Sequence, residues 1–279
     1  MKDKVVLFHQ NCVDGFSGAW VARRKFGDEA SYVGVSDHKQ FPEGLEDKEV
    51  YAVDFSYTKE ATEELLKIVK SLVLIDHHVS VEDVVKSVPD HLYALEKSGA
   101  SLAWEYFFPQ EDVPTFIKYV EDTDLWNFTL PQARDFFALG ETLEYDFETW
   151  DKLIEDFENP GKRQMHLDYG SNIRQYQEKI VDKLVEDGEV VELEGYNALS
   201  MNSPVFRSQA GNAAVKKGYD IGIIWKHSSD GTIKVSLRSK KDGDVDVAKI
   251  AQKYGGGGHQ SSAAFVLQNE TEMPWYPKN

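Results

Sequence analysis

The sequence predicts an α/β protein with a parallel-sheet N-terminal domain, a helical connector and a smaller mixed α/β C-terminal domain. In the first 130 residues, short apolar and β-branched runs alternate with helical segments, which is typical of a parallel sheet covered on both faces. A helical, acidic and strand-poor stretch follows, and a β-rich pattern returns at Val190. A chain of 279 residues is long enough for two cores. We therefore expect domains at 1–130 and 190–270, a connector at 131–189 and an irregular tail at 271–279.

Individual elements of the first domain follow from local patterns. Thr58 is a typical N-cap for a helix over 58–70, in which apolar residues recur at helical spacing. Further helices are expected at 14–26, 101–108 and 115–121, and strands at 5–9, 32–35, 50–54 and 72–76.

In the rest of the chain the sequence NPGKR at 159–163 interrupts the helical connector. Strands are then expected within 190–202, 221–227 and 232–239, and a helix at 245–254 precedes the segment GGGGHQSSAAFVL.

Composition excludes several classes of protein. The net charge of −17 argues against non-specific binding to duplex nucleic acid, which depends on Lys and Arg at the phosphates. Residues 190–279 are the exception, with 11 basic and 9 acidic side chains and hence a net charge of +2. A single cysteine excludes an internal disulfide framework. No apolar run is long enough to span a membrane, and the start of the chain lacks the apolar region of a signal peptide, which predicts a cytoplasmic protein.

Metal-ligand side chains stand at the ends of three expected strands. The run from Val5 ends at His9, the run from Val50 ends at Asp54, and the run from Leu72 ends at Asp76, His77 and His78. A strand-terminal Asp is ordinarily a cap or turn former. Three such ends would meet at the carboxyl edge of one parallel sheet, where ligands bind. Imidazole and carboxylate without a thiolate cluster suit Mn, Fe, Co or Zn, and oxygen-rich sites favour Mn or Mg. A carboxylate that bridges two ions would give a two-metal phosphoester site.

The motifs resemble those of a known family. IDHH at 75–78 resembles the signature of the DHH phosphoesterase superfamily, and GGGGH at 255–259 resembles that of its associated C-terminal domain. Three other segments match in order and spacing: FHQNCVDG at 8–15, VDFS at 53–56 and EDTDLW at 121–126. The same two-domain arrangement occurs in RecJ-type exonucleases and in nanoRNA and pAp phosphatases.

The resemblance implies roles for individual residues. His9 and Asp54 would hold one ion; the other would be held by Asp14, Asp54, His77 and Asp122, so that Asp54 is the bridge. Asp76 would orient the site and His78 would face the phosphate or the leaving oxygen. The implied cofactors are two divalent ions, with Mn²⁺ favoured and Mg²⁺ or Co²⁺ as alternatives.

Two positions leave alternatives open. Asp122 aligns with the family motif, although spacing alone does not choose it over Asp124. Cys12 stands where the family commonly has the first aspartate of a D-x-D pair. It is either a thiolate ligand, since metals deprotonate thiols, or a spectator, in which case Asn11 or water would complete the shell of the metal.

The C-terminal domain is expected to hold the substrate. Gly256, Gly257 and Gly258 would let backbone N–H groups approach a phosphate as an anion nest, to which His259 adds a donor. Arg238 in SLRS matches the family's Arg-bearing strand and would bind a phosphate bidentately.

These observations predict a two-metal hydrolase of phosphodiester or phosphomonoester bonds in short oligonucleotides or small nucleotides, with its site in an interdomain cleft. No duplex binding and no membrane binding are expected. The alternatives are a single-stranded DNA exonuclease, a cyclic-dinucleotide phosphodiesterase, a pyrophosphatase, and a nucleotide- or metal-binding module that has lost catalysis.

Overall fold

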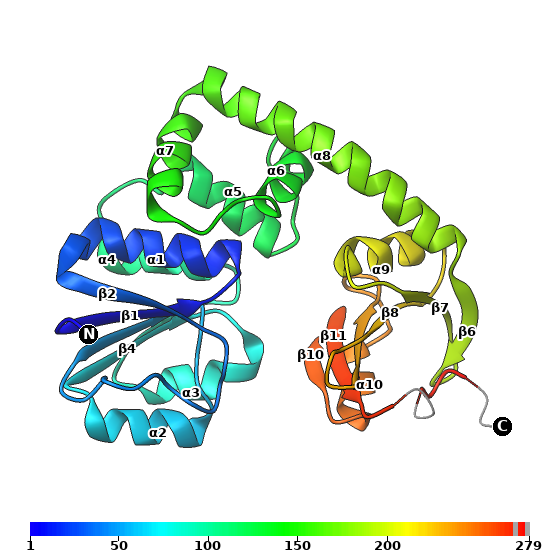
Figure 1. The fold of residues 1–279 in the computed structure, drawn as a ribbon, viewed down its shortest axis with the longest axis horizontal. Helices are drawn as coiled ribbons and strands as arrows, with labels where there is room; N and C mark the ends of the chain where they lie inside the picture. Colours follow the sequence, from blue (N-terminus) through cyan, green and yellow to red (C-terminus); the bar gives the residue numbers. More distant parts are fainter. Residues whose placement is uncertain (270–272, 277–279) are drawn as a thin grey trace. The chain divides into compact units, whose positions relative to one another are not determined.

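A computed structural model describes residues 1–269 and 273–276. The chain forms two compact units, Met1–Arg174 and Gln175–Asn279, and each has its own sheet (Figure 1). The predicted fold class is confirmed: a parallel sheet comes first, helices follow, and a mixed sheet comes last. Within the described part of the chain, none of the helices is both long enough and apolar enough to cross a bilayer.

The first unit is built on a five-stranded sheet in the order β2-β1-β3-β4-β5, and every neighbouring pair is parallel. In β1 the side chains alternate: Val5 and Leu7 enter the core on one face of the sheet, whereas Val6 and Phe8 enter the core on the other. Burial on both faces explains why these strands are continuous apolar runs. The strands are β1 (Lys4–His9), β2 (Ala30–Val35), β3 (Glu49–Val53), β4 (Ser71–Asp76) and β5 (Asp90–Tyr93).

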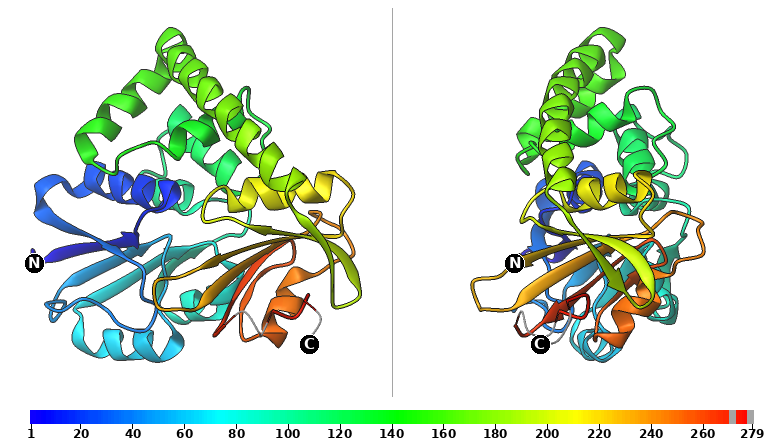
Figure 2. Two further views of the ribbon diagram at one scale, coloured as in Figure 1. Left: turned by 45° about the vertical axis from the view of Figure 1, so that its right-hand side comes forward. Right: turned by 90° about the vertical axis from the view of Figure 1, so that its right-hand side faces the viewer.

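Helices cover both faces of this sheet (Figures 1 and 2). On one face lie α1 (Val13–Phe26) and α4 (Gly99–Phe107), and on the other lie α2 (Lys59–Ile68) and α3 (Glu82–Ser87). The Thr58 cap is confirmed, because its hydroxyl accepts a hydrogen bond from the Ala61 amide at 3.3 Å. Two short 3-10 turns, η1 (Gly27–Glu29) and η2 (Val79–Val81), complete the connections.

The helical stretch after residue 130 is not a separate body. Phe136 of α6 (Ala133–Gly140), Trp150 of α7 (Phe147–Glu158) and Leu167 of α8 (Pro160–Glu186) join the same core as α1, α4 and α5 (Thr115–Asp124). Its expected break lies where Asn159 caps α8 by accepting the amide hydrogens of Gly161 and Lys162. The boundary between the units therefore falls inside α8, after Arg174, which differs from the expected connector at 131–189.

The second unit contains a six-stranded mixed sheet in the order β10-β11-β9-β8-β7-β6. Helix α10 (Val247–Lys253) packs on the face that carries Val235, Leu237 and Phe265, and α9 (Arg207–Lys216) packs over part of the opposite face. Of the expected tail, Met273 and Trp275 are buried in this core; 271–272 and 277–279 lie outside the described residues. The strands are β6 (Glu189–Leu193), β7 (Tyr196–Asn202), β8 (Ile221–His227), β9 (Ile233–Arg238), β10 (Gly257–His259) and β11 (Ser262–Leu267).

The strand order of the first sheet fixes where a ligand can bind. After β1 the chain crosses to β2 on one side, and β3 then pairs with β1 on the other. Such a reversal opens a crevice at the carboxyl ends of the two central strands. His9 ends β1 and Asp54 directly follows β3, so both lie at this point.

Candidate metal centre

Three groups of potential metal ligands gather at the carboxyl edge of the parallel sheet. Within each group the ligand atoms lie within 4.8 Å of one another. The groups share members, because Asp54 belongs to two of them and His77 belongs to two of them. They are His9–Cys12–Asp54, Asp54–His77–His78 and Asp14–His77–Asp124.

Asp54 is the centre of the cluster. Its side chain is only 2% exposed, and its backbone is left-handed, with φ at +55°, a conformation that Asp tolerates better than most residues. This turn follows β3, and the Asp54 amide still donates to the Ile75 carbonyl at 2.9 Å. One carboxylate oxygen lies 3.5 Å from His9 Nδ1, and the other lies 3.2 Å from His77 Nε2. A single carboxylate therefore faces both histidines.

Asp14 reaches the cluster from the first turn of α1. One of its oxygens accepts the Gly99 amide at 2.7 Å and the other accepts the Ala100 amide at 3.0 Å, so the carboxylate also caps α4. The oxygen bonded to Gly99 lies 3.8 Å from His77 Nε2. Gly99 permits this approach, because a Cβ there would stand 2.6 Å from the Asp54 Cβ. The absence of a side chain at 99 brings the two carboxylates together.

Asp76 lies beside the cluster and contacts His78, which belongs to one of the three groups. Asp76 accepts the Ser56 hydroxyl at 2.6 Å and the amides of His77 and His78 at 2.7 and 3.0 Å. His78 Nδ1–H donates to the same carboxylate at 2.8 Å. This bond fixes the orientation of the imidazole ring, so that Nε2 is the nitrogen directed away from Asp76. The predicted orienting role of Asp76 fits this geometry.

The structure brings Asp124, rather than Asp122, into the cluster. Asp124, the last residue of α5, lies 3.5 Å from His77 Nε2. The Asp122 carboxylate accepts the Thr129 amide and hydroxyl and the Leu130 amide, at 2.9, 2.6 and 3.1 Å. Two residues along a helix differ by about 200° in direction, so the two acids face opposite ways. In the structure Asp122 therefore holds the turn that follows the helix, whereas Asp124 faces the cluster.

The charges of the metal-free cluster are poorly balanced. Burial and the neighbouring carboxylates raise the pKa of Asp14 well above its usual range and that of Asp124 to about 6. Burial opposes the protonation of His77, but the carboxylates of Asp54, Asp14 and Asp124 outweigh it and raise the pKa of His77 to about 10. For Cys12, burial and then the carboxylates of Asp54 and Asp14 raise the pKa of the thiol. Bound protons reduce the negative charge of this cluster, and a bound cation would reduce it in the same way.

The donor set fits divalent metal ions. Asp54 Oδ1 and His77 Nε2 are buried, and neither has a hydrogen-bond partner although they lie 3.2 Å apart. A buried acceptor oxygen and a buried imidazole nitrogen that both lack a hydrogen-bond partner are suited to bind a shared cation. Imidazole and carboxylate donors match Mn, Fe, Co and Zn.

In the second unit, Arg238 lies in register with Ser262 and His259 on the neighbouring strands. Arg238 lies opposite Ser262, and Ser262 lies opposite His259, so the three form one row across β9, β11 and β10. Residues directly opposite one another point to the same face. The Arg238 guanidinium donates to the Leu237 carbonyl at 2.9 Å and to the Ser208 hydroxyl at 2.7 Å. Sequence reasoning missed Arg207 and Ser208, because only the packing of α9 on the sheet brings them to Arg238.

Gly256, the first glycine of the expected nest, uses its amide within the protein. The amides of Gly255 and Gly256 donate to the carbonyls of Gln252 and Ala251 at the end of α10. Gly257 and Gly258 pair with β11, and a Cβ at Gly256 would stand 2.1 Å from the Ala264 carbonyl oxygen. The glycine run therefore allows close backbone packing of the turn, and His259 at the end of β10 is exposed.

Comparisons with known proteins agree with this architecture. A profile of the DHHA1 domain matches residues 196–274. The chain is 31% identical over 288 residues to an uncharacterized protein of Acanthamoeba polyphaga mimivirus, in an alignment that covers 94% of this chain and 67% of that protein.

Three solved structures share the fold. The DHH domain of a member of the S1p family of ribosomal proteins has a TM-score of 0.64 at 14% identity, over 98% of this chain and 84% of that one. A pGpG-specific phosphodiesterase of Vibrio cholerae has 0.54 at 13%, over 97% and 95%. The exonuclease RecJ bound to manganese has 0.52 at 15%, over 95% and 86%. The chain belongs to one family with the mimivirus protein and carries a DHHA1 domain, and the fold of these structures supports the DHH phosphoesterase superfamily that its motifs predict.

Proposed function

We propose that the protein is a two-metal hydrolase of phosphodiester or phosphomonoester bonds in short oligonucleotides or small nucleotides. The observation that carries the proposal is the sharing of Asp54 between a His9 group and a His77 group, which is the arrangement needed to hold two ions side by side. The similar fold of a phosphodiesterase and of a manganese-bound exonuclease supports this reading. We propose that Mn²⁺ supports hydrolysis best, with Mg²⁺ or Co²⁺ as substitutes.

The chain's own residues have distinct tasks in this reaction. His9, Asp54, His77, Asp14 and Asp124 would hold the ions, which supply positive charge to the phosphate and activate water. His78, fixed through Nδ1 by Asp76, is placed to hold a proton at Nε2 for the leaving oxygen. Its bond to Asp76 outweighs the effect of burial and raises the pKa of His78, which favours the protonated ring in the metal-free protein.

The substrate would be positioned by the second unit. Arg238 and His259 lie in one row of the sheet, on the face from which Arg207 donates to Ser236 at 3.5 Å. Burial and the nearby Arg207 lower the pKa of Arg238 to about 10, which still leaves it charged at neutral pH. Two guanidinium groups beside serine hydroxyls suit a terminal phosphate.

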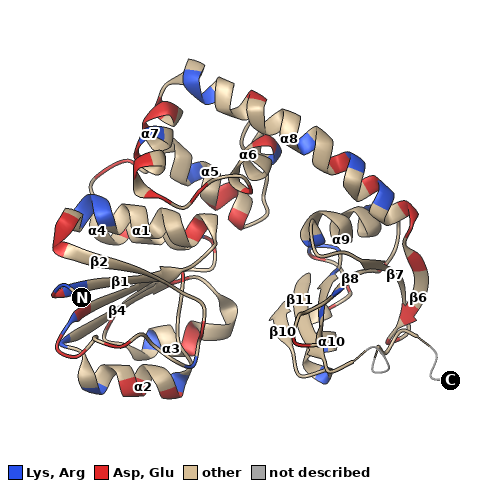
Figure 3. Ribbon diagram, viewed as in Figure 1, with Lys and Arg blue, Asp and Glu red and all other residues tan. Residues whose placement is uncertain are grey.

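The charge distribution favours short substrates. Acidic residues are frequent on α7, whereas β9, β10 and β11 carry none (Figure 3). Acidic surface repels a long polyanion more strongly than it repels a substrate of a few nucleotides. We therefore propose no stable duplex binding and no membrane binding, with a single-stranded DNA exonuclease and a cyclic-dinucleotide phosphodiesterase as the alternative activities.

The test is hydrolysis by the full chain with Mn²⁺ of a panel of substrates: short RNA, short and long single-stranded DNA, pAp, a cyclic dinucleotide and pyrophosphate. We expect turnover of the short oligoribonucleotides or pAp, and none in excess EDTA. Asp54→Asn should abolish turnover while the fold is kept, since Asn also tolerates a positive φ.

The matched control is Asp47→Asn. Asp47 is exposed and has nearly the same backbone conformation, with φ at +58°. The Asp47→Asn variant should retain the wild-type rate of hydrolysis. Activity in the Asp54 variant, or full activity after exhaustive chelation, would disprove the two-metal proposal. A folded protein that binds Mn²⁺ but hydrolyses nothing in the panel would favour a binding module that has lost catalysis.

A further inference from the structure

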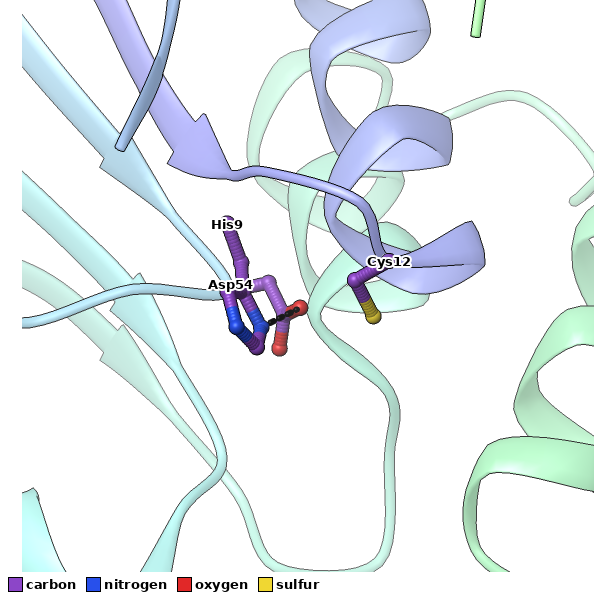
Figure 4. Close-up of side chains that lie close together, drawn as sticks. All are labelled: His9, Cys12 and Asp54. Atoms are coloured by element: carbon purple, nitrogen blue, oxygen red, sulfur yellow. Dashed lines mark ion pairs between the residues drawn. The ribbon is translucent and has the colours of Figure 1, made fainter. Parts of the chain in front are cut away.

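Cys12 stands at the start of α1, next to two candidate metal ligands. Figure 4 shows its thiol near His9, which ends β1, and Asp54, which follows β3. Cys12 is the N-cap residue of α1, yet its side chain makes no capping hydrogen bond. Ser, Thr, Asp and Asn are the residues that stabilise this position in a helix. Helix capping therefore does not account for a cysteine here.

The separations are close to those of a bound ion. The ligand atoms of His9, Cys12 and Asp54 all lie within 4.8 Å of one another. A metal–sulfur bond is about 2.3 Å and a metal–nitrogen bond about 2.1 Å, so two ligands of one tetrahedral ion lie about 3.6 Å apart. The three side chains would therefore have to close in on an ion that binds between them.

The carboxylate between the two histidine groups is a second observation. Asp54 is only 2% exposed, and its Oδ1 lies 3.2 Å from His77 Nε2 without a hydrogen-bond partner. Its other oxygen lies 3.5 Å from His9 Nδ1 and is the one available to an ion beside Cys12. A buried carboxylate that faces an imidazole on each side is suited to a cation on each side.

Resting on the proposed function, we propose that Cys12 is a thiolate ligand of the ion held by His9 and Asp54. This half of the centre would then contain sulfur, nitrogen and oxygen donors, whereas the Asp14–His77–Asp124 half contains only nitrogen and oxygen. Sulfur donors favour Zn²⁺ and Co²⁺ over Mn²⁺ and Mg²⁺. The two halves would therefore select different ions when both kinds are supplied.

The test uses Co²⁺ as a spectroscopic probe of the full chain, after the protein has been made metal-free. A bound thiolate gives a sulfur-to-cobalt charge-transfer band in the near ultraviolet, and Cys12 is the sole cysteine in the sequence, so the band has one possible source. We expect the band in the wild type and its loss in Cys12→Ser. Asp124→Asn, which removes a donor from the other half, should keep the band while the number of bound ions falls.

Competition gives a second readout. At this half, the ratio of the affinity for Zn²⁺ to that for Mn²⁺ should be at least about tenfold higher in the wild type than in Cys12→Asp. Two bound Co²⁺ ions without the band, or equal metal preference in the wild type and in Cys12→Asp, would refute thiolate ligation. Chelator-sensitive hydrolysis combined with no band would leave the proposed function intact. A band without hydrolysis of any substrate would refute the function and support the ligand.

Discussion

Replacing Asp122 and Asp124 in turn should separate folding from metal binding within a single turn of α5. The Asp122 side chain is 6% exposed and accepts three hydrogen bonds from Thr129 and Leu130 at 2.6–3.1 Å. A hydrogen bond to a charged group contributes about 1.5–3 kcal/mol. The three bonds share one carboxylate and Thr129 is exposed, so they do not add fully. We expect Asp122→Ala to lose about 2–4 kcal/mol of unfolding free energy.

Asp124→Asn should behave in the opposite way. Burial and the carboxylate of Asp54 raise the pKa of Asp124 to about 6, so removing its charge relieves repulsion in the metal-free protein. Its unfolding free energy in EDTA should equal or exceed that of the wild type. The stabilisation by metal should shrink, because a ligand at 100 times its Kd stabilises by about 2.7 kcal/mol only if the site binds it.

Urea unfolding in EDTA and thermal unfolding during a Mn²⁺ titration measure the two effects. Normal stability in EDTA together with a lost metal response in Asp122→Ala would show that Asp122 is the ligand. A rise of Tm with Mn²⁺ in Asp124→Asn that equals the rise in the wild type would also speak for Asp122 as the ligand.

Three further predictions follow from other contacts. Gly99→Ala should reduce the number of bound Mn²⁺ ions measured by calorimetry, because its Cβ would meet the Asp54 Cβ at 2.6 Å; a wild-type stoichiometry would show that the turn adjusts. Arg238→Gln should raise KM about ten- to a hundredfold for substrates with a terminal phosphate. Its effect on bis-p-nitrophenyl phosphate should be much smaller, and the metal content should not change. Equal effects on both substrates would contradict a positioning role. In EDTA the folded protein keeps a proton on His77 up to about pH 10, whereas the unfolded chain loses it near 6.5. That contribution to stability is complete below pH 6.5 and is lost as the pH rises towards 10, so Tm in EDTA should fall across this range, and a profile as flat as that of His77→Gln would contradict it.

The central strands β1, β3 and β4 of the first sheet were predictable because they are buried on both faces. The run from Val5 to Phe8 cannot be amphipathic at helical spacing, and it ends at a polar residue. The strand β5 (Asp90–Tyr93) escaped prediction because it is short and lies at the sheet edge, where DHLY has no apolar run. The unit boundary also escaped prediction, because α8 is one continuous helix whose first half packs with Leu167 in the N-terminal core.

The gathering of the strand-end side chains at one edge was predictable for a related reason. In a parallel sheet the last residue of each strand reaches the same edge, so position in the sequence gives position in space for His9, Asp54 and His77. For residues that reach a site through the packing of a helix, position in the sequence does not give position in space. Arg207 comes next to Arg238 only through the packing of α9 on β8 and β9, and a local sequence pattern does not encode that contact.

The two acids of EDTD show why spacing could not decide between them. The Asp122 carboxylate binds the amides of the segment after α5, where Trp126 and Phe128 both have a positive φ. Those bonds hold the chain in a sharp turn, and the end of α5 is fixed in place. Asp124, on the other side of the helix, thereby reaches His77 although it belongs to no strand end. The neighbour that matches the family motif would then act on the metal by positioning, and the neighbour that misses the motif would supply the ligand. If this is correct, Asp122→Ala should weaken Mn²⁺ binding only through partial unfolding, and a low temperature or a stabilising osmolyte should restore its affinity, whereas neither should restore Asp124→Asn.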